Sequence, residues 1–253
     1  MKRLFKSLTI LIVLLSSIST TLANDVVLYV TRHGKTMFNN THRVQGWSDT
    51  PLTKDGITVA EQLGRGLKGI PFIAVYASDL GRARQTARVA LEAKGDTQIN
   101  IIELPGLRET CFGVFEGDLD PNMWTPAAQH LGYASDEALM QDFAARKIGM
   151  DKMMNALKAV DTSGESEDYA TVKKRMLDSL TMIAKDAQAK GGGNVLVVSH
   201  GMAIIALVND MLDQPANKGL QNASVTKIRY TDAGKFVIES FDDMSFVEKG
   251  KQQ

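Results

Sequence analysis

Asp25-Val26-Val27-Leu28-Tyr29-Val30-Thr31-Arg32-His33-Gly34 is the stretch that decides the fold. Its continuous apolar run, rich in β-branched and aromatic residues, predicts a strand that is buried on both faces of a sheet. Open α/β sheets keep their active sites at the carboxyl ends of their strands. The sequence therefore predicts that Arg32 and His33 lie where such a fold does its chemistry.

A second run repeats this arrangement. Asn194-Val195-Leu196-Val197-Val198-Ser199 ends in His200-Gly201, and the apolar segment that follows is typical of a buried helix. A single histidine at a strand end is usually structural, but two in matching places favour one shared site. A neutral imidazole is a good nucleophile near neutral pH, and the adjacent guanidinium suits phosphate oxygens. The pair predicts phosphoryl chemistry.

Strand-like and helical patterns alternate along the chain, which predicts an α/β fold. We expect a three-layer sandwich: a mostly parallel central sheet with helices on both faces and a terminal hairpin. The predicted strands are Val26-Thr31, Phe72-Ala77, Ile99-Glu103, Val195-Ser199, Ser224-Tyr230 and Lys235-Ser240, and the predicted helices are about 53–68, 81–94, 166–189 and 202–212.

The alternation stops between residues 117 and 166, where the sequence is helical or irregular and rich in methionine. We interpret this segment as a helical lid insertion. The alternative is an ordinary helical layer whose methionines fill gaps in the core. From Asp118 to Asp168 the chain carries ten acidic and four basic residues. These acids would repel polyanionic substrates if they faced the cleft.

The first 23 residues have the layout of a secretory signal peptide, with Lys2, Arg3 and Lys6 before a short apolar core and a cleavage position after Ala23. An uncleaved anchor is the alternative. Cleavage leaves a single domain over 24–253, secreted or periplasmic, with no further long apolar run for stable membrane association. The net charge is zero before cleavage, which argues against nucleic-acid binding.

Several other polar residues are candidates for the site. Thr36 and Asn39 follow His33 and are able to bind an anion by hydrogen bonds. Arg82 is expected in the first turn of a helix, where backbone amides favour phosphate, unless it is a solvated helix arginine. Glu109 is a candidate proton donor, and Glu116 is the competing carboxylate.

One glycine motif is misleading. Gly64-Arg65-Gly66-Leu67-Lys68-Gly69 has the spacing of a dinucleotide-binding fingerprint. That fingerprint follows a strand and opens a helix. Here the glycines close a predicted helix, so we expect no dinucleotide site.

Taken together, these motifs resemble the histidine phosphatase superfamily, in its phosphoglycerate-mutase-like branch. The resemblance covers about residues 26–210 and keeps the family's order of motifs. It rests on Arg32-His33-Gly34, Thr36, Asn39, Gln45-Gly46, 49–56, 78–87, Glu109 and Ser199-His200-Gly201, with Gly164-Glu165-Ser166 and Arg175 further along.

The resemblance implies a mechanism. His33 would attack phosphorus and become a phosphohistidine, while Arg32, Arg82 and His200 neutralise the phosphoryl oxygens. Glu109 would protonate the leaving group and then activate water. The substrate-binding set it implies is Arg32, Thr36, Asn39, Gln45, Gly46, Arg82, His200 and Gly201. It implies no metal and no cofactor.

The family contains hydrolases and mutases, and we expect a hydrolase. A mutase that holds a phosphorylated acid needs more cations around its mouth than residues 118–168 supply. The leading hypothesis is an exported acid or near-neutral phosphomonoesterase that acts on small organic phosphate esters. A phosphoglycerate-mutase-type phosphotransferase and a non-catalytic phospholigand-binding protein are the alternatives. Preference for a phosphoprotein and the oligomeric state stay open.

Overall fold

A computed structural model describes residues 25–252, so the predicted signal peptide lies outside the described residues. A six-stranded mixed sheet forms its centre, in the order β3-β2-β4-β1-β5-β6. β1 to β4 are mutually parallel, and β5 runs antiparallel to both of its neighbours. The strands are β1 Val26–Arg32, β2 Phe72–Ala77, β3 Ile101–Glu103, β4 Gly193–Ser199, β5 Val225–Tyr230 and β6 Phe236–Asp243.

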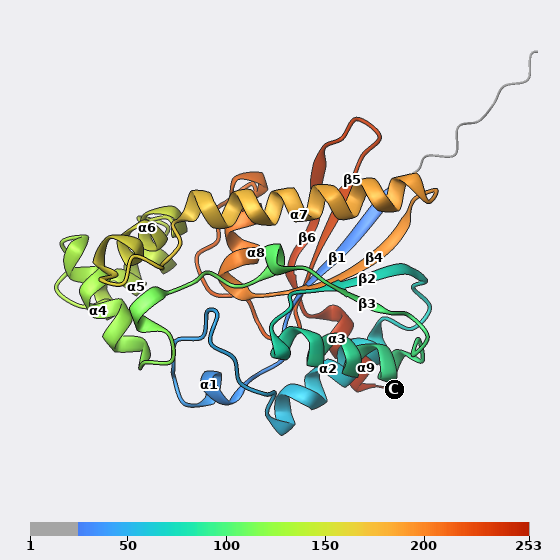
Figure 1. Ribbon diagram of the computed structural model, residues 1–253, viewed down its shortest axis with the longest axis horizontal. Helices are drawn as coiled ribbons and strands as arrows, with labels where there is room; N and C mark the ends of the chain where they lie inside the picture. Colours follow the sequence, from blue (N-terminus) through green and yellow to red (C-terminus); the bar gives the residue numbers. More distant parts are fainter. Residues whose placement is uncertain (1–24, 253) are drawn as a thin grey trace, which may run out of the picture.

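Helices cover both faces of this sheet, as predicted (Figure 1). The longest helix, α7, lies with α8 on one face, and α2, α3 and α9 lie on the other. The helices are α1 Met37–Asn40, α2 Lys54–Gly66, α3 Gly81–Lys94, α4 Asp120–His130, α5 Asp136–Ala144, α6 Met150–Val160, α7 Tyr169–Ala189, α8 Gly201–Val208 and α9 Ser245–Lys251, with 3₁₀ turns at Pro105–Leu107, Gly113–Phe115 and Asn209–Met211.

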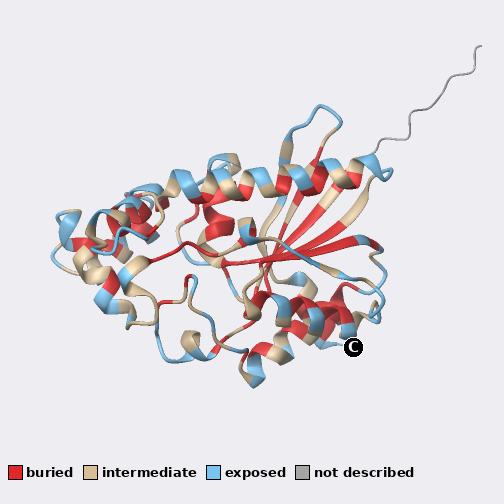
Figure 2. Ribbon diagram, viewed as in Figure 1, coloured by how far each residue is buried: buried red, intermediate tan, exposed pale blue. Residues whose placement is uncertain are grey.

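Alternation along the strands builds two cores, one on each face. In β1, Leu28 and Val30 pack into the cluster under α7 and α8, whereas Tyr29 packs into the cluster with α2, α3 and α9. Successive strand side chains point to opposite faces, and both faces are buried here (Figure 2). The apolar runs in the sequence are continuous for this reason.

β1 and β4 are neighbours in the sheet, although 160 residues separate them in the sequence. Their parallel register pairs Arg32 with Ser199. The backbone N–H of His33 donates to the carbonyl of Ser199 at 3.0 Å. The two histidines that follow the strands are therefore brought to the same edge of the sheet, as the strand-end motifs predicted.

The misleading glycine motif serves helix packing. A Cβ at Gly64 would collide with the backbone of Ala90 in α3, and a Cβ at Gly66 would collide with the backbone of Phe246 in α9. Gly250 of α9 makes the same close approach to the backbone of Gln62. Glycine lets these helix backbones touch, which explains the spacing without a nucleotide.

Some predicted boundaries were wrong. β3 begins at Ile101 rather than Ile99, and α7 begins at Tyr169 because Asp168 caps it by accepting the N–H of Thr171. The helix predicted over 202–212 ends at Val208 and continues as a 3₁₀ turn. The sequence analysis missed α9, since its seven residues are too short to show a clear helical period.

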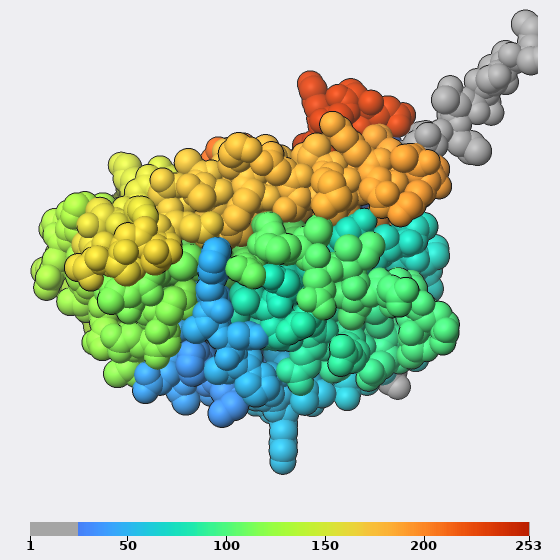
Figure 3. Space-filling model, in the orientation of Figure 1, coloured from blue at the N-terminus to red at the C-terminus, as the bar shows by residue number. Residues whose placement is uncertain are grey.

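The segment predicted to be helical over 117–166 forms α4, α5 and α6. It makes one end of the molecule, where its green and yellow surface lies next to the blue segment after β1 (Figure 3). Met150, Met153 and Met154 of α6 belong to the main core cluster. Methionines of this segment thus do fill the core. Whether the segment moves as a lid stays a prediction. None of the helices in residues 25–252 is long and apolar enough to cross a membrane.

Candidate active site

A cavity of about 480 Å³ opens at the carboxyl ends of the strands. Of the residues predicted for the site, six line it: Arg32, His33, Asn39, Gln45, Glu109 and Gly201. The other four, Thr36, Gly46, Arg82 and His200, are buried and do not line it.

His33 is held by hydrogen bonds at its ring and at its carbonyl. The Nδ1 of His33 lies 2.8 Å from the carbonyl oxygen of Gly34. The side-chain amide of Asn222 donates to the backbone carbonyl of His33 at 2.9 Å. Because a carbonyl can only accept, Nδ1 carries the proton and Nε2 keeps its lone pair. Burial and the positive charges of Arg82 and Arg32 hold the pKa of His33 well below its usual range. The ring is thus a neutral imidazole with Nε2 available.

His200 is the N-cap residue of α8 and is completely buried. Its ring centroid lies 5.2 Å from that of His33. Burial holds the pKa of His200 well below its usual range, and the positive charge of Arg82 is the next largest cause. Neither of its ring nitrogens has a hydrogen-bond partner among the described residues.

Arg32 lies between the two histidines and the loop before β5. One guanidinium nitrogen donates to the carbonyl of Leu220, while its Nε is buried without a partner among residues 25–252. Gly201 lies beside it, and a Cβ at that position would come 3.4 Å from Nε. The glycine leaves room for the guanidinium against the start of α8.

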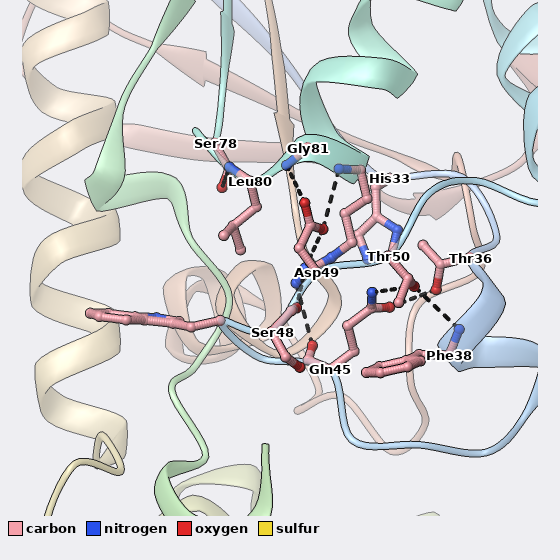
Figure 4. A network of polar contacts seen from close by, with 12 residues as sticks. His33, Thr36, Phe38, Gln45, Ser48, Asp49, Thr50, Ser78, Leu80 and Gly81 are labelled. Atoms are coloured by element: carbon pink, nitrogen blue, oxygen red, sulfur yellow. Dashed lines mark hydrogen bonds and ion pairs between the residues drawn. The ribbon is translucent and has the colours of Figure 1, made fainter. Parts of the chain in front are cut away.

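Arg82 is the second residue of α3 and is fully buried, so the solvated alternative was wrong. Its guanidinium donates to the carbonyls of Ser48 and Gly46 at 2.9 and 2.6 Å and to Asp49 Oδ1 at 3.0 Å. Asp49 also accepts the backbone N–H of Gly81, as Figure 4 shows. Arg82 thus anchors the 45–49 loop, and its Nε is the donor left without a partner in the described part of the chain.

Thr36 and Asn39 cap α1 reciprocally. Thr36 Oγ1 accepts the N–H of Asn39, and Asn39 Oδ1 accepts the N–H of Thr36. Because Oδ1 is used in this way, the NH₂ of Asn39 is the group left for a ligand in the cavity. Thr36 also donates to Gln45 Oε1 at 2.6 Å, and the amide nitrogen of Gln45 donates to Thr50 (Figure 4).

The two candidate carboxylates have different surroundings. Glu109 lines the cavity and accepts the backbone N–H groups of Met202 and Ala203, at 3.0 and 2.8 Å, in the first turn of α8. Glu116 does not line the cavity; it accepts the N–H groups of 46–48 and of Phe112. A Cβ at Gly46 would collide with this carboxylate. Glu109 is therefore placed to meet a ligand, whereas Glu116 fixes a loop.

An ion pair between Arg175 of α7 and Glu167, which precedes this helix, holds the loop that carries Glu109. Arg175 donates to the carbonyls of Arg108 and Glu109 at 2.6 and 2.7 Å and pairs with Glu167 at 2.7 Å. Glu167 in turn accepts the N–H of Cys111 at 3.0 Å. Arg175 and Glu167 therefore fix the backbone on either side of the Glu109 side chain.

The sequence analysis missed Lys35, Asn222 and Leu220, which also line the cavity. Lys35 was within reach of sequence reasoning, because it stands two positions after His33. Asn222 and Leu220 lie in a loop before β5 whose sequence carries no catalytic or phosphate-binding motif. Only the pairing of β5 with β1 brings this loop to the site.

Buried nitrogens without partners gather around the histidine pair. They are Arg32 Nε, Arg82 Nε and the two ring nitrogens of His200. Buried donors are normally paired, and exceptions call for an explanation. An anion between the two rings would accept from these groups and offset the charge of both guanidinium groups. No group of three or more His, Cys, Asp or Glu side chains in residues 25–252 is placed to hold a metal.

The family model of the histidine phosphatase superfamily (branch 1) matches residues 28–146 and 137–243. The chain belongs to this family. Its members include proteins with different names, and three similar proteins illustrate this range.

The first is "probable phosphoglycerate mutase GpmB" of Erwinia tasmaniensis, which is 29% identical over 229 residues, covering 87% of this chain and 94% of that protein. The crystal structure of a phosphoglycerate mutase from Bacillus anthracis is 42% identical, with a TM-score of 0.85, and covers 91% of this chain and 99% of that one. A phosphoserine phosphatase from Entamoeba histolytica, at 24% identity and a TM-score of 0.63 over 88% and 99% of the two chains, shares the fold.

Proposed function

We propose that this chain is an exported phosphomonoesterase that acts through a phosphohistidine on small organic phosphate esters. The observation that carries the proposal is the state of His33. Its Nδ1 proton is used by the carbonyl of Gly34 at 2.8 Å, and the ring is kept neutral beside two buried guanidinium groups. A neutral nucleophile in a cationic pocket suits attack on an anionic phosphoryl group.

The reaction has two steps. Nε2 of His33 forms a bond to phosphorus while the bond from phosphorus to the ester oxygen breaks, and protonated Glu109 gives its proton to the departing alkoxide. Glu109, now a carboxylate, takes a proton from water, whose oxygen attacks phosphorus and releases His33 and inorganic phosphate. Arg32, Arg82 and His200 bind the phosphoryl oxygens during both steps.

The pH range follows from these roles. Because burial and Arg82 depress the pKa of His33, the nucleophile stays neutral in moderately acidic solution. The acid step needs a proton on Glu109. We therefore expect an acidic or near-neutral optimum.

The contents of the cavity favour hydrolysis over mutase activity. Of the ten acidic and four basic side chains between Asp118 and Asp168, Asp120 is the one that lines the cavity in the described chain. No cation of that segment is there to hold the carboxylate of a phosphoglycerate. The mutase remains the second candidate, because Lys35 and Arg43 line the cavity from the other side and because the two more similar proteins are named mutases.

Export is supported by residues 1–23, whose basic start, apolar core and Ala23 fit a cleaved signal. We expect the full chain, expressed in a bacterium, to be recovered outside the cytoplasm with Asn24 as its first residue. Amino-terminal sequencing of the purified protein checks this. A chain that keeps Met1 in the membrane fraction would be an uncleaved anchor.

The test of activity uses the mature chain, with EDTA present, on phenyl phosphate and on 2- and 3-phosphoglycerate. We expect release of inorganic phosphate from phenyl phosphate, and a loss on the order of 10⁴-fold or more in His33→Ala, because the variant lacks the attacking atom. Enzyme quenched in alkaline denaturant during turnover of a phosphate-labelled ester should carry the label in the wild type but not in the variant, because the P–N bond of phosphohistidine survives base and is lost in acid.

Each other result points elsewhere. Interconversion of the phosphoglycerates that outpaces ester hydrolysis would make the chain a mutase. Binding of phosphate esters without turnover of any of them would make it a binding protein. Hydrolysis that survives in His33→Ala would remove the histidine from the mechanism.

A further inference from the structure

The part of the cavity away from His33 is apolar. Beyond Asp120, each side chain that α4, α5 and α6 contribute to the cavity is a methionine or an aromatic residue, and each helix supplies two of them. We call this set the helical wall: Met123, Trp124, Met140, Phe143, Met150 and Met153.

The helical wall continues the hydrophobic core. Phe143, Met150 and Met153 belong to the main core cluster, and Met123 belongs to the cluster with Phe112. Because these side chains pack into the core clusters, they stay at the cavity surface and keep that surface apolar. Met202 and Ile205 of α8 also line the cavity and pack against the same core clusters.

We propose that the helical wall binds the alcohol half of the substrate and that this alcohol is hydrophobic, an alkyl or aryl group rather than a polyol or a hydroxy acid. The inference rests on the proposed phosphatase function. With phosphate beside His33, the rest of the ester lies in the cavity that the helical wall borders, and that wall is its largest apolar surface. A polyol there would give up hydrogen bonds to water and find none in return.

The methionines set how selective this surface is. Met is unbranched and polarisable, and it adapts to groups of different shapes. A cavity of about 480 Å³ lies in the range of small-molecule sites. The wall therefore suits a class of hydrophobic alcohols rather than one compound.

The charged residues of the cavity have both signs. Arg43 donates from Nη1 to the carbonyl of Gly117 at 2.8 Å, which leaves its other N–H groups open to a ligand. Lys35 and Asp120 carry opposite charges and line the same cavity. A substrate with a carboxylate would meet the Asp120 carboxylate as well as these cations, so the charges give no clear preference for an acid.

The test compares linear alkyl phosphates of two, four and six carbons, and propyl phosphate with glycerol phosphate, which differs by two hydroxyl groups. We expect kcat/KM to rise about two- to four-fold with each methylene, and propyl phosphate to be at least about ten-fold better than glycerol phosphate. Binding of ethyl-, butyl- and hexylphosphonate, measured by calorimetry, should follow the same order. A phosphonate is not hydrolysed, so this measurement does not depend on turnover.

Two variants test where the preference arises. Met140→Gln keeps the length of a partly exposed side chain in the helical wall but adds an amide, and it should lower the hexyl-to-ethyl ratio several-fold. Met182→Gln makes the same change at an exposed position of α7, and it should leave the ratio as in the wild type. Met140 is chosen because the more buried methionines carry a greater risk of misfolding.

The outcomes separate the two proposals. Turnover with no dependence on chain length, or a preference for glycerol phosphate, overturns the hydrophobic subsite and leaves the phosphatase standing. No turnover, but phosphonate binding that strengthens with chain length, overturns the phosphatase and supports the subsite. Neither turnover nor length-dependent binding overturns both.

Discussion

The two ends of the cavity are built by different means. At one end, His33 is fixed by three hydrogen bonds: its backbone N–H donates to the Ser199 carbonyl, its Nδ1 donates to the Gly34 carbonyl, and its carbonyl accepts from the Asn222 side chain. At the other end, the helical wall is fixed by side-chain packing within the core clusters. A substitution leaves the backbone bond between His33 and Ser199 in place, whereas it replaces the surface of a packed wall. The position of His33 therefore depends mainly on the sheet, while the proposed substrate preference depends on replaceable side chains.

The largest effect is expected at the His33 end of the cavity. Glu109→Gln cannot give or take a proton, so kcat should fall by about 10²- to 10⁴-fold. Glu116→Gln changes the neighbouring carboxylate, which binds the 46–48 loop and lies off the cavity. We expect it to lower the melting temperature more than kcat. Kinetics and thermal denaturation of both variants check this.

The pair of variants is its own control, because each removes one carboxylate charge from the same loop region. If Glu116→Gln loses the greater part of kcat while Glu109→Gln keeps it, the roles of the two residues are reversed. Equal losses in both would mean that the loop acts as a unit.

The next largest effect is expected in the core behind the helical wall. Met154 is fully buried in α6, one residue after the wall residue Met153, and does not line the cavity. Met154→Ala should lower the free energy of unfolding by about 2–5 kcal/mol, since it leaves a cavity in the core. Hydrolysis per folded molecule should change much less, because the strand-end residues keep their main-chain bonds. Urea denaturation and single-point kinetics measure the two quantities, and a proportionate loss of both would refute the separation.

The smallest effect is a pH dependence of stability from the two histidines. Burial and Arg82 hold the pKa of His33 and of His200 well below 6.5, while an unfolded chain protonates such rings near pH 6.5. Below that pH the unfolded state binds more protons, so stability falls as the pH drops, by up to about 1.4 kcal/mol per pH unit for each ring. Above pH 6.5 this contribution is fully present.

His200→Gln removes one of the two rings. Denaturation at pH 7.5, 6.5 and 5.5 should show a shallower fall below pH 6.5 in the variant than in the wild type, whatever the difference in their absolute stability. Asp and Glu side chains have lower pKa values than histidine, and their protonation affects the wild type and the variant alike. Parallel curves would mean that His200 takes up protons equally in the folded and the unfolded states.

Much of the fold was predictable because it depends on local patterns. The six strands were found from apolar runs, and the hairpin of β5 and β6 was found from the turn around Gly234, whose φ of 74° suits glycine. The helix α9 was not predicted, because its position depends on glycine contacts with α2, which is distant in the sequence. Arg82 and Glu116 were identified as charged groups, but their hydrogen-bond partners lie on distant loops.

The sequence alone determined the α/β class, the two strand-end histidines and the family, because each is written in a short motif whose geometry follows from strand and helix periods. The tertiary structure decided which carboxylate faces the cavity, that Arg82 anchors a loop, and that six apolar side chains from three helices line the same cavity as His33. These facts depend on distances between residues far apart in the chain, which only the folded backbone sets.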